Sequence, residues 1–200
     1  MDRRLMNQLP MALVLLRGAI APFLLWDALD GHITPWFLVG YVVAVLSDIF
    51  DGIIARRLGV SSANLRRADS WADVALYVCI AAAAWFVHRD IVLAFRLPLF
   101  TVIAAQVLWW LVNLAKYGKP ASYHTYSAKL WGLTLLAATL AVFGLNSGGI
   151  ALWVAILVGI VHTLEEIAMT LILPTWQHDV LSLIHALRLR RELSTTQMLD

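Results

Sequence analysis

The sequence predicts an all-α integral membrane protein with six transmembrane helices and an amphipathic C-terminal helix. The first observation is composition: 61% of the 200 residues are hydrophobic and only 14% are charged, which is typical of polytopic membrane proteins. The second is that six apolar runs are each long enough to cross the hydrocarbon core of a bilayer. The third is that the basic residues between these runs fall almost entirely on one side.

The six candidate spans are separated by short clusters of turn-forming or charged residues. They cover residues 9–28, 34–56, 70–88, 91–113, 124–145 and 150–173. The first span superficially resembles a signal peptide, but Arg17 interrupts its apolar run and Pro22 follows the Ala-Ile-Ala triplet that resembles a cleavage site. We therefore expect this span to be retained, and residues 1–200 to form a single membrane domain.

Basic residues predict the orientation of the spans. If the N-terminus is cytoplasmic, the opposite side carries only Arg89 and Arg96. The cytoplasmic side then carries Arg3, Arg4, Arg56, Arg57, Arg66, Arg67, Lys116, Lys119, Arg188, Arg190 and Arg191. This asymmetry favours an even number of spans with both ends in the cytoplasm. Residues 180–191 mix apolar and basic side chains at helical spacing, which predicts an amphipathic helix on the inner membrane surface.

Two classes of protein are disfavoured by composition. The formal net charge is only +2, and no basic run with interleaved aromatic residues suggests a nucleic-acid partner. The single cysteine, Cys79, excludes an intrachain disulfide framework and a cysteine-rich metal site.

Ionisable side chains within the spans lie at a similar depth, near the predicted cytoplasmic side. A charge inside a span costs about 2.5–3.5 kcal/mol on insertion scales, so such residues mark candidate functional sites. The set comprises Arg17, Asp48, Asp51, Asp69, Asp73, Lys129, Glu165 and Glu166. Their common depth predicts one polar cavity open to the cytoplasm, in preference to separate side chains that extend to the interface.

The four aspartates form two pairs. Asp48 and Asp51 are three residues apart, and Asp69 and Asp73 are four apart, so each pair shares one helix face. Carboxylates without Cys or His suit Mg²⁺, Mn²⁺ or Ca²⁺, and two such ions could bridge a pyrophosphate.

Two residues beside the first pair suit a phosphate ligand. Gly52 has no side chain, which leaves space for a ligand to approach the helix backbone. Arg56, one turn further on, could pair with a phosphate.

Residues 48–73 resemble the signature of the CDP-alcohol phosphotransferases, an integral-membrane family of phospholipid biosynthesis. The family pattern is D-x2-D-G-x2-A-R-x8-G-x3-D-x3-D, and the matching positions are Asp48, Asp51, Gly52, Ala55, Arg56, Asp69 and Asp73. Leu65 stands where the pattern has glycine. In the first span, residues 10–17 resemble the family's P-N-x-x-T-x-x-R segment, with Met11 and Val14 in place of Asn and Thr.

The resemblance implies an enzyme that transfers a phosphatidyl or phospho-alcohol group from a CDP-linked donor to an alcohol acceptor and releases CMP. It implies two Mg²⁺ or Mn²⁺ ions held by the four aspartates, with Asp73 as the base that deprotonates the acceptor. It also suggests membrane lipids as partners, a homodimer, and an active site facing the cytoplasm. Residues matched to nucleotide-binding or basic positions of the family are Gly52, Ala55, Arg56, Lys129 and Arg17.

Two other functions remain as alternatives. One is an inactive or altered family member that binds metal or lipid, because Leu65 departs from the signature. The other is a cation or proton transporter, which is less favoured because the outer halves of the spans are nearly free of charge.

For several side chains, two alternative roles remain. Lys129 either holds a phosphate or neutralises the carboxylates. His162 is either a hydrogen-bonded structural residue or a metal ligand together with a neighbouring glutamate, and one of Glu165 and Glu166 could pair with Arg17. Arg66 and Arg67 either bind an acidic acceptor or contact anionic headgroups.

Overall fold

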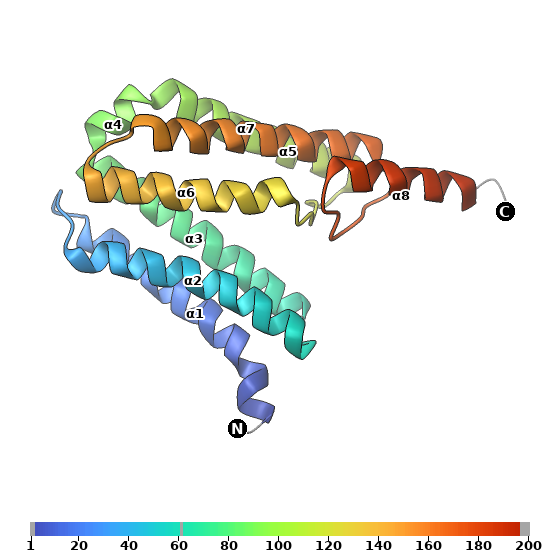
Figure 1. The fold of residues 1–200 in the computed structure, drawn as a ribbon, viewed down its shortest axis with the longest axis horizontal. Coiled ribbons are helices and arrows are strands. Elements are labelled where there is room, and N and C mark those ends of the chain that lie inside the picture. Colours follow the sequence, from blue (N-terminus) through green and yellow to red (C-terminus); the bar gives the residue numbers. More distant parts are fainter. Residues whose placement is uncertain (1–2, 61, 197–200) are drawn as a thin grey trace. The chain divides into compact units, whose positions relative to one another are not determined.

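The computed structural model describes residues 3–60 and 62–196, which form eight helices (Figure 1). These helices are α1 (Arg3–Asp27), α2 (Pro35–Leu58), α3 (Ala63–Val87), α4 (Arg89–Ala94), α5 (Arg96–Tyr117), α6 (Tyr126–Leu145), α7 (Gly149–Ile172) and α8 (Leu183–Thr196). Six of them, all except α4 and α8, are long and apolar enough to cross a membrane. The chain is therefore an all-α integral membrane protein, which confirms the predicted fold class.

The chain forms two compact units, and the first comprises residues 1–93 and 142–147. In this unit α1 packs against both α2 and α3. Gly40 allows α2 to lie close to α1, because a Cβ atom at this position would be only 3.1 Å from Leu24 Cδ2. The rings of Phe37 and Phe143, with centroids 4.5 Å apart, join residues 142–147 to the same core.

The connection between α2 and α3 is short, and specific residues cap the end of α2 and the start of α3. Gly59 ends α2 in the left-handed region, with φ of +66°, a conformation that glycine adopts without a steric penalty. Ser62 then caps α3, because its Oγ accepts a hydrogen bond from the Leu65 N–H at 3.2 Å. The third span therefore begins earlier than predicted: α3 starts at residue 63 and not at 70, so Asp69 and Asp73 lie two to three turns inside the helix.

The second unit comprises residues 94–141 and 148–200, in which α7 packs against both α5 and α8. The fourth span was predicted at 91–113, but the helix breaks at Phe95 between α4 and α5, and α5 continues to Tyr117. Lys116 closes the C-terminal end of α7, since its Nζ donates to the carbonyls of Thr170 and Leu171 at 2.8 and 2.9 Å. This lysine therefore satisfies helix-end carbonyls that would otherwise lack a donor.

The C-terminal amphipathic helix is confirmed, although it begins at Leu183 and not at residue 180. Ala186 is fully buried in a cluster with Met169 and Leu173, while Ile184 and Leu187 are exposed. The nearby Tyr123 belongs to the same cluster, and burial raises the pKa of its hydroxyl.

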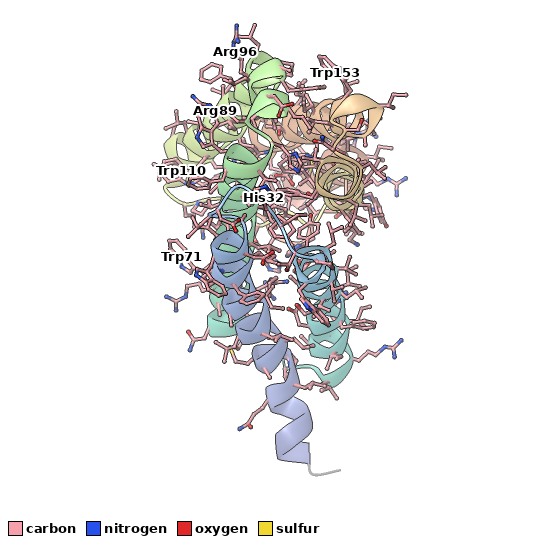
Figure 2. The ribbon with its side chains drawn as sticks, turned by 90° about the vertical axis from the view of Figure 1, so that its left-hand side faces the viewer. His32, Trp71, Arg89, Arg96, Trp110 and Trp153 are labelled. Carbon is pink, nitrogen blue, oxygen red and sulfur yellow. The ribbon has the colours of Figure 1, made fainter. Side chains whose placement is uncertain are left out.

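Large apolar side chains point outward from both units, as expected for helices that face lipid. Trp71, in the first unit, is 73% exposed, and Figure 2 shows it projecting away from its helix. Trp110 and Trp153, in the second unit, are also exposed. In the first unit, Arg89 lies over the ring of Trp85, 5.0 Å from its centroid.

Gly159 marks a close contact between α6 and α7, and replacing it with alanine is expected to destabilise the protein by about 1–3 kcal/mol. A Cβ atom at Gly159 would lie 2.6 Å from Nε1 and 2.8 Å from Cε2 of Trp131. Thermal unfolding in detergent measures the effect. Gly132→Ala is the matched control on α6, since a Cβ there would meet nothing within 4 Å. If both variants unfold at the same temperature, this contact does not limit the packing of α7.

Candidate functional site

The motif aspartates converge on one side chain from α1. Arg17 is fully buried and forms ion pairs with aspartates of both α2 and α3. Its Nη1 donates a hydrogen bond to Asp48 and its Nη2 donates to Asp69. Nη1 is also 3.6 Å from Asp51 Oδ2, and Nε is 3.3 Å from Asp73 Oδ1. The three helices of the first unit thus bring together one guanidinium and four carboxylates.

The carboxylates differ in burial. The side chain of Asp51 is only 7% exposed, whereas those of Asp48, Asp69 and Asp73 are 45%, 37% and 39% exposed. The cluster is therefore closed beside Asp51 and accessible beside the other three. Within the described part of the chain, the buried Asp51 Oδ2 has no hydrogen-bond donor.

Three of these carboxylates are placed to share a cation. One oxygen each from Asp48, Asp51 and Asp69 lies within 4.8 Å of the other two. Oxygen ligands lie about 2.0–2.6 Å from Mg²⁺ or Ca²⁺, so two ligands on opposite sides of an ion are about 4–5 Å apart. The donor atoms and their spacing fit a divalent ion, and Asp51 Oδ2, which accepts no hydrogen bond among the described residues, supports the fit. Asp73 is not part of this group of three.

The remaining motif residues lie near the end of α2 and the start of α3. Arg56 folds back over Gly52, because a Cβ at Gly52 would lie 3.2 Å from Arg56 Nη1. Ala55 is buried, and its carbonyl accepts a hydrogen bond from the Val60 N–H at 3.1 Å. Leu65 is half-buried in the first turn of α3.

Three of the predicted intramembrane ionisable residues, Lys129, Glu165 and Glu166, belong to the second unit, as does His162. Lys129 is exposed on α6, with its Nζ 5.4 Å from the ring centroid of Tyr126. His162 is buried on α7 and lies within hydrogen-bond distance of two hydroxyls, at 3.3 Å from Ser127 Oγ and 3.5 Å from Thr125 Oγ1. The Nδ1 atom that makes both contacts also lies 3.9 Å from Glu166 Oε1.

The two glutamates of α7 have hydroxyl partners in the same unit. Glu166 accepts a hydrogen bond from Thr125 at 3.4 Å. Glu165 accepts one from Ser127, and its Oε1 accepts the Leu183 N–H at the start of α8 at 3.0 Å. Neither Thr125 nor Ser127 carries charge, so a search for charged residues in spans could not single them out. Arg17, which was expected as a possible partner of one of these glutamates, forms ion pairs with the aspartates of its own unit.

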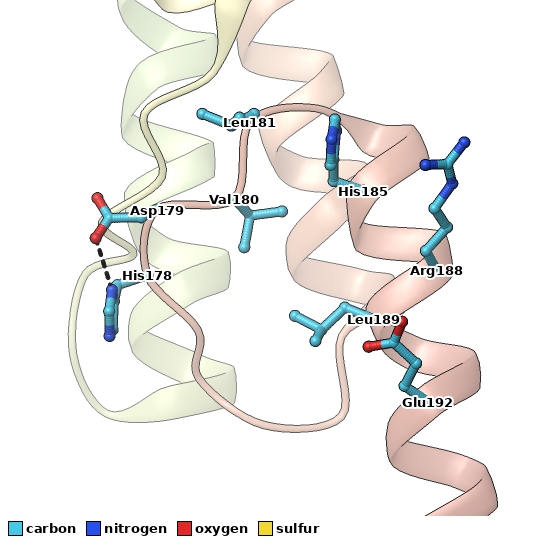
Figure 3. Close-up of a pocket in the computed structure, with 8 residues that line it drawn as sticks. All are labelled: His178, Asp179, Val180, Leu181, His185, Arg188, Leu189 and Glu192. Atoms are coloured by element: carbon cyan, nitrogen blue, oxygen red, sulfur yellow. Dashed lines mark hydrogen bonds and ion pairs between the residues drawn. The ribbon is translucent and has the colours of Figure 1, made fainter.

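A pocket of about 310 Å³ lies between residues 178–181 and α8 (Figure 3). The pocket is lined by side chains that can carry either charge, and three of them, His185, Arg188 and Glu192, come from α8. His178 Nδ1 forms a hydrogen bond with Asp179 Oδ2 at 2.8 Å. Both members of this pair are exposed. The pocket therefore has a mixed lining, to which Val180, Leu181 and Leu189 contribute apolar surface.

Comparison with known proteins identifies one family. The model of the CDP-alcohol phosphatidyltransferase family matches residues 7–161, which include Arg17 and all of the motif aspartates. The match ends before His162, α8 and the pocket of Figure 3. No match was found among curated proteins or among solved structures.

Proposed function

The chain belongs to the CDP-alcohol phosphatidyltransferase family, and from this we propose that it transfers a phosphatidyl or phospho-alcohol group from a CDP-linked donor to an alcohol and releases CMP. The family consists of membrane transferases of phospholipid biosynthesis. The observation that carries the proposal is the convergence of Asp48, Asp51 and Asp69 at the family's motif.

The proposed cofactor is a pair of Mg²⁺ or Mn²⁺ ions. Asp48, Asp51 and Asp69 are the proposed metal ligands. Asp73, the fourth motif aspartate, is expected to be a further metal ligand. When bound, such ions would neutralise the diphosphate of the donor and polarise its phosphoryl oxygens. Hard carboxylate ligands favour these ions over zinc.

Asp73 is proposed to take the proton of the acceptor. Its side chain is 39% exposed, so an acceptor hydroxyl can reach it from outside the helices. As the hydroxyl oxygen forms a bond to the phosphorus nearer the lipid or alcohol, its proton passes to the carboxylate. The bond from that phosphorus to the bridging oxygen breaks, and CMP leaves with the bond's electron pair.

Arg56 and Gly52 are proposed to receive the diphosphate. The guanidinium already lies against the glycine, and a planar guanidinium can bind two phosphate oxygens at once. Ala55 is proposed to lie beside the same diphosphate site, where its small side chain leaves space for the donor. Lys129 and Arg17 are the further proposed cationic residues, on the basis of the basic positions that they match in the family; Lys129 either holds a phosphate or neutralises carboxylates.

Three further features are proposed on the basis of the family and the charge pattern. The active site faces the cytoplasm, as the distribution of basic residues predicts. Arg66 and Arg67, both exposed, contact anionic headgroups or an acidic acceptor. The enzyme acts as a homodimer.

The test is CMP release by purified protein with Mn²⁺ or Mg²⁺. CDP-diacylglycerol and water-soluble CDP-alcohols serve as donors, each with a panel of alcohols and lipid alcohols as acceptors. Release that requires both a CDP-linked donor and an acceptor supports the proposal. No release from any combination argues for the alternative of a family member that binds metal or lipid without turnover, and metal-dependent ion flux in liposomes would favour a transporter.

Leu65→Gly tests the alternative directly, because it restores the signature. We expect this variant to release CMP faster than the parent at low donor concentration, since the Leu65 side chain occupies space that the family keeps open. A glycine in the first turn of α3 costs up to about 1 kcal/mol of helix stability, so thermal unfolding is measured alongside. Leu65→Ala separates lost bulk from backbone freedom. Equal rates for all three proteins would show that Leu65 does not restrict the donor.

A further inference from the structure

Arg17 occupies the centre of the aspartate cluster. Each of its three guanidinium nitrogens faces a carboxylate: Nη1 faces Asp48 and Asp51, Nη2 faces Asp69, and Nε faces Asp73. The side chain is fully buried. The guanidinium is thus surrounded by the same four carboxylates that are proposed to hold the metal ions.

The charges explain why a cation must be present there. Four carboxylates carry a formal charge of −4, and Arg17 lowers the total to −3. Without it, the buried Asp51 and its neighbours would repel one another across a few ångströms in a medium that screens charge poorly. Arg17 therefore performs in the isolated chain part of the task that a divalent ion would perform.

A divalent ion and the guanidinium compete for this space, because both are cations and both require the same oxygens. The group of three carboxylates that fits an ion comprises Asp48, Asp51 and Asp69, and Nη1 or Nη2 already contacts each of them. An entering ion would have to take these oxygens from Arg17.

We propose that Arg17 is an internal cation that holds the carboxylates together when no metal is bound and competes with divalent ions for them. The inference rests on the proposed function, since it requires that the aspartates bind metal. It assigns Arg17 a positioning role that sets metal affinity. A site occupied by its own arginine for most of the time has an apparent metal affinity reduced by the fraction of time that it is open.

The experiment compares Mn²⁺ binding to the full chain and to Arg17→Gln, by electron paramagnetic resonance of free Mn²⁺ and by thermal unfolding with and without Mn²⁺. We expect Arg17→Gln to bind Mn²⁺ about 10-fold more tightly, to unfold at a lower temperature without metal, and to gain more from Mn²⁺ than the parent does. Arg17→Lys retains the charge with fewer donors and should give intermediate affinity.

Arg57→Gln is the matched control. Arg57 is an exposed arginine at the end of α2, so its loss changes the net charge equally without emptying the cluster. Its Mn²⁺ affinity is expected to remain close to that of the parent. An equal gain in Arg57→Gln and Arg17→Gln would overturn the inference, because general electrostatics would then explain both.

The remaining outcomes separate the inference from the proposed function. If the parent binds Mn²⁺ and Arg17→Gln binds it equally or more weakly, the competition is overturned while the metal centre stands. If neither protein binds Mn²⁺, the metal centre itself is refuted. Recovery of folded Arg17→Gln only in the presence of Mn²⁺ supports the inference. If that variant is not recovered at all, Arg17→Lys decides, and parent-like affinity overturns the inference.

Discussion

Asp73→Asn is expected to lower the rate of CMP release by about 10²–10⁴-fold, the usual contribution of a positioned general base. Asparagine has nearly the same size as aspartate, so the packing of α3 should be retained, but its amide cannot accept the proton of the acceptor. Asp73 also lies outside the group of three carboxylates that fits a single ion. The loss should therefore appear in turnover more than in Mn²⁺ affinity.

The measurement is CMP release at saturating donor, acceptor and Mn²⁺, with Mn²⁺ binding recorded on the same preparations. Asp90→Asn is the matched control, because Asp90 is an exposed aspartate in the first turn of α4, away from the motif. A variant at Asp73 that retains the parental rate would exclude this residue as the base. A variant that loses Mn²⁺ binding would identify Asp73 as a ligand whose loss explains the rate.

Removal of the divalent ion is expected to lower CMP release by at least ~10²-fold, because a metal that polarises phosphoryl oxygens contributes several kcal/mol to the transition state. Asp51→Asn is the corresponding variant. Asp51 is the most buried of the four aspartates, and its Oδ2 has no hydrogen-bond donor among the described residues. An amide there loses the charge that attracts an ion.

The assay follows CMP release after treatment with EDTA, and again after adding back Mg²⁺ or Mn²⁺. The parent should regain activity with either ion, whereas Asp51→Asn should need much higher ion concentrations. Ca²⁺, which binds the same donors with a larger coordination shell, tests whether charge alone suffices. Full activity in EDTA would contradict a metal-dependent mechanism.

The sequence predicted the spans well because hydropathy depends only on local composition. It failed at the start of α3, where four of residues 63–69 are polar or charged, so that hydropathy alone does not extend the span over them. That turn forms because Ser62 caps it, a local hydrogen bond that a hydropathy count cannot detect. The break at Phe95 was missed for a related reason, since residues 91–94 are apolar and the single charge of Arg96 does not interrupt the apolar run as hydropathy measures it.

The candidate site was predicted in part. The spacing of the aspartates placed each pair on one helix face, and the structure brings both pairs to Arg17. The identity of the partner was not predictable from depth alone, because Glu165 and Glu166 have a similar expected depth and the same charge. Side-chain hydroxyls such as those of Thr125 and Ser127 satisfy these glutamates instead, and neutral residues leave no mark in a charge pattern.

During synthesis, α1 leaves the ribosome before the aspartates that pair with Arg17 have been made. An isolated span that carries an arginine within the hydrocarbon core is inserted at a cost of up to about 2.5–3.5 kcal/mol, and α1 has no acidic partner of its own at that depth. The compensating carboxylates arrive on α2 and α3, up to residue 73. The first three helices are therefore expected to become stably embedded as a group, with α1 committed to the bilayer only after α3 has been translated.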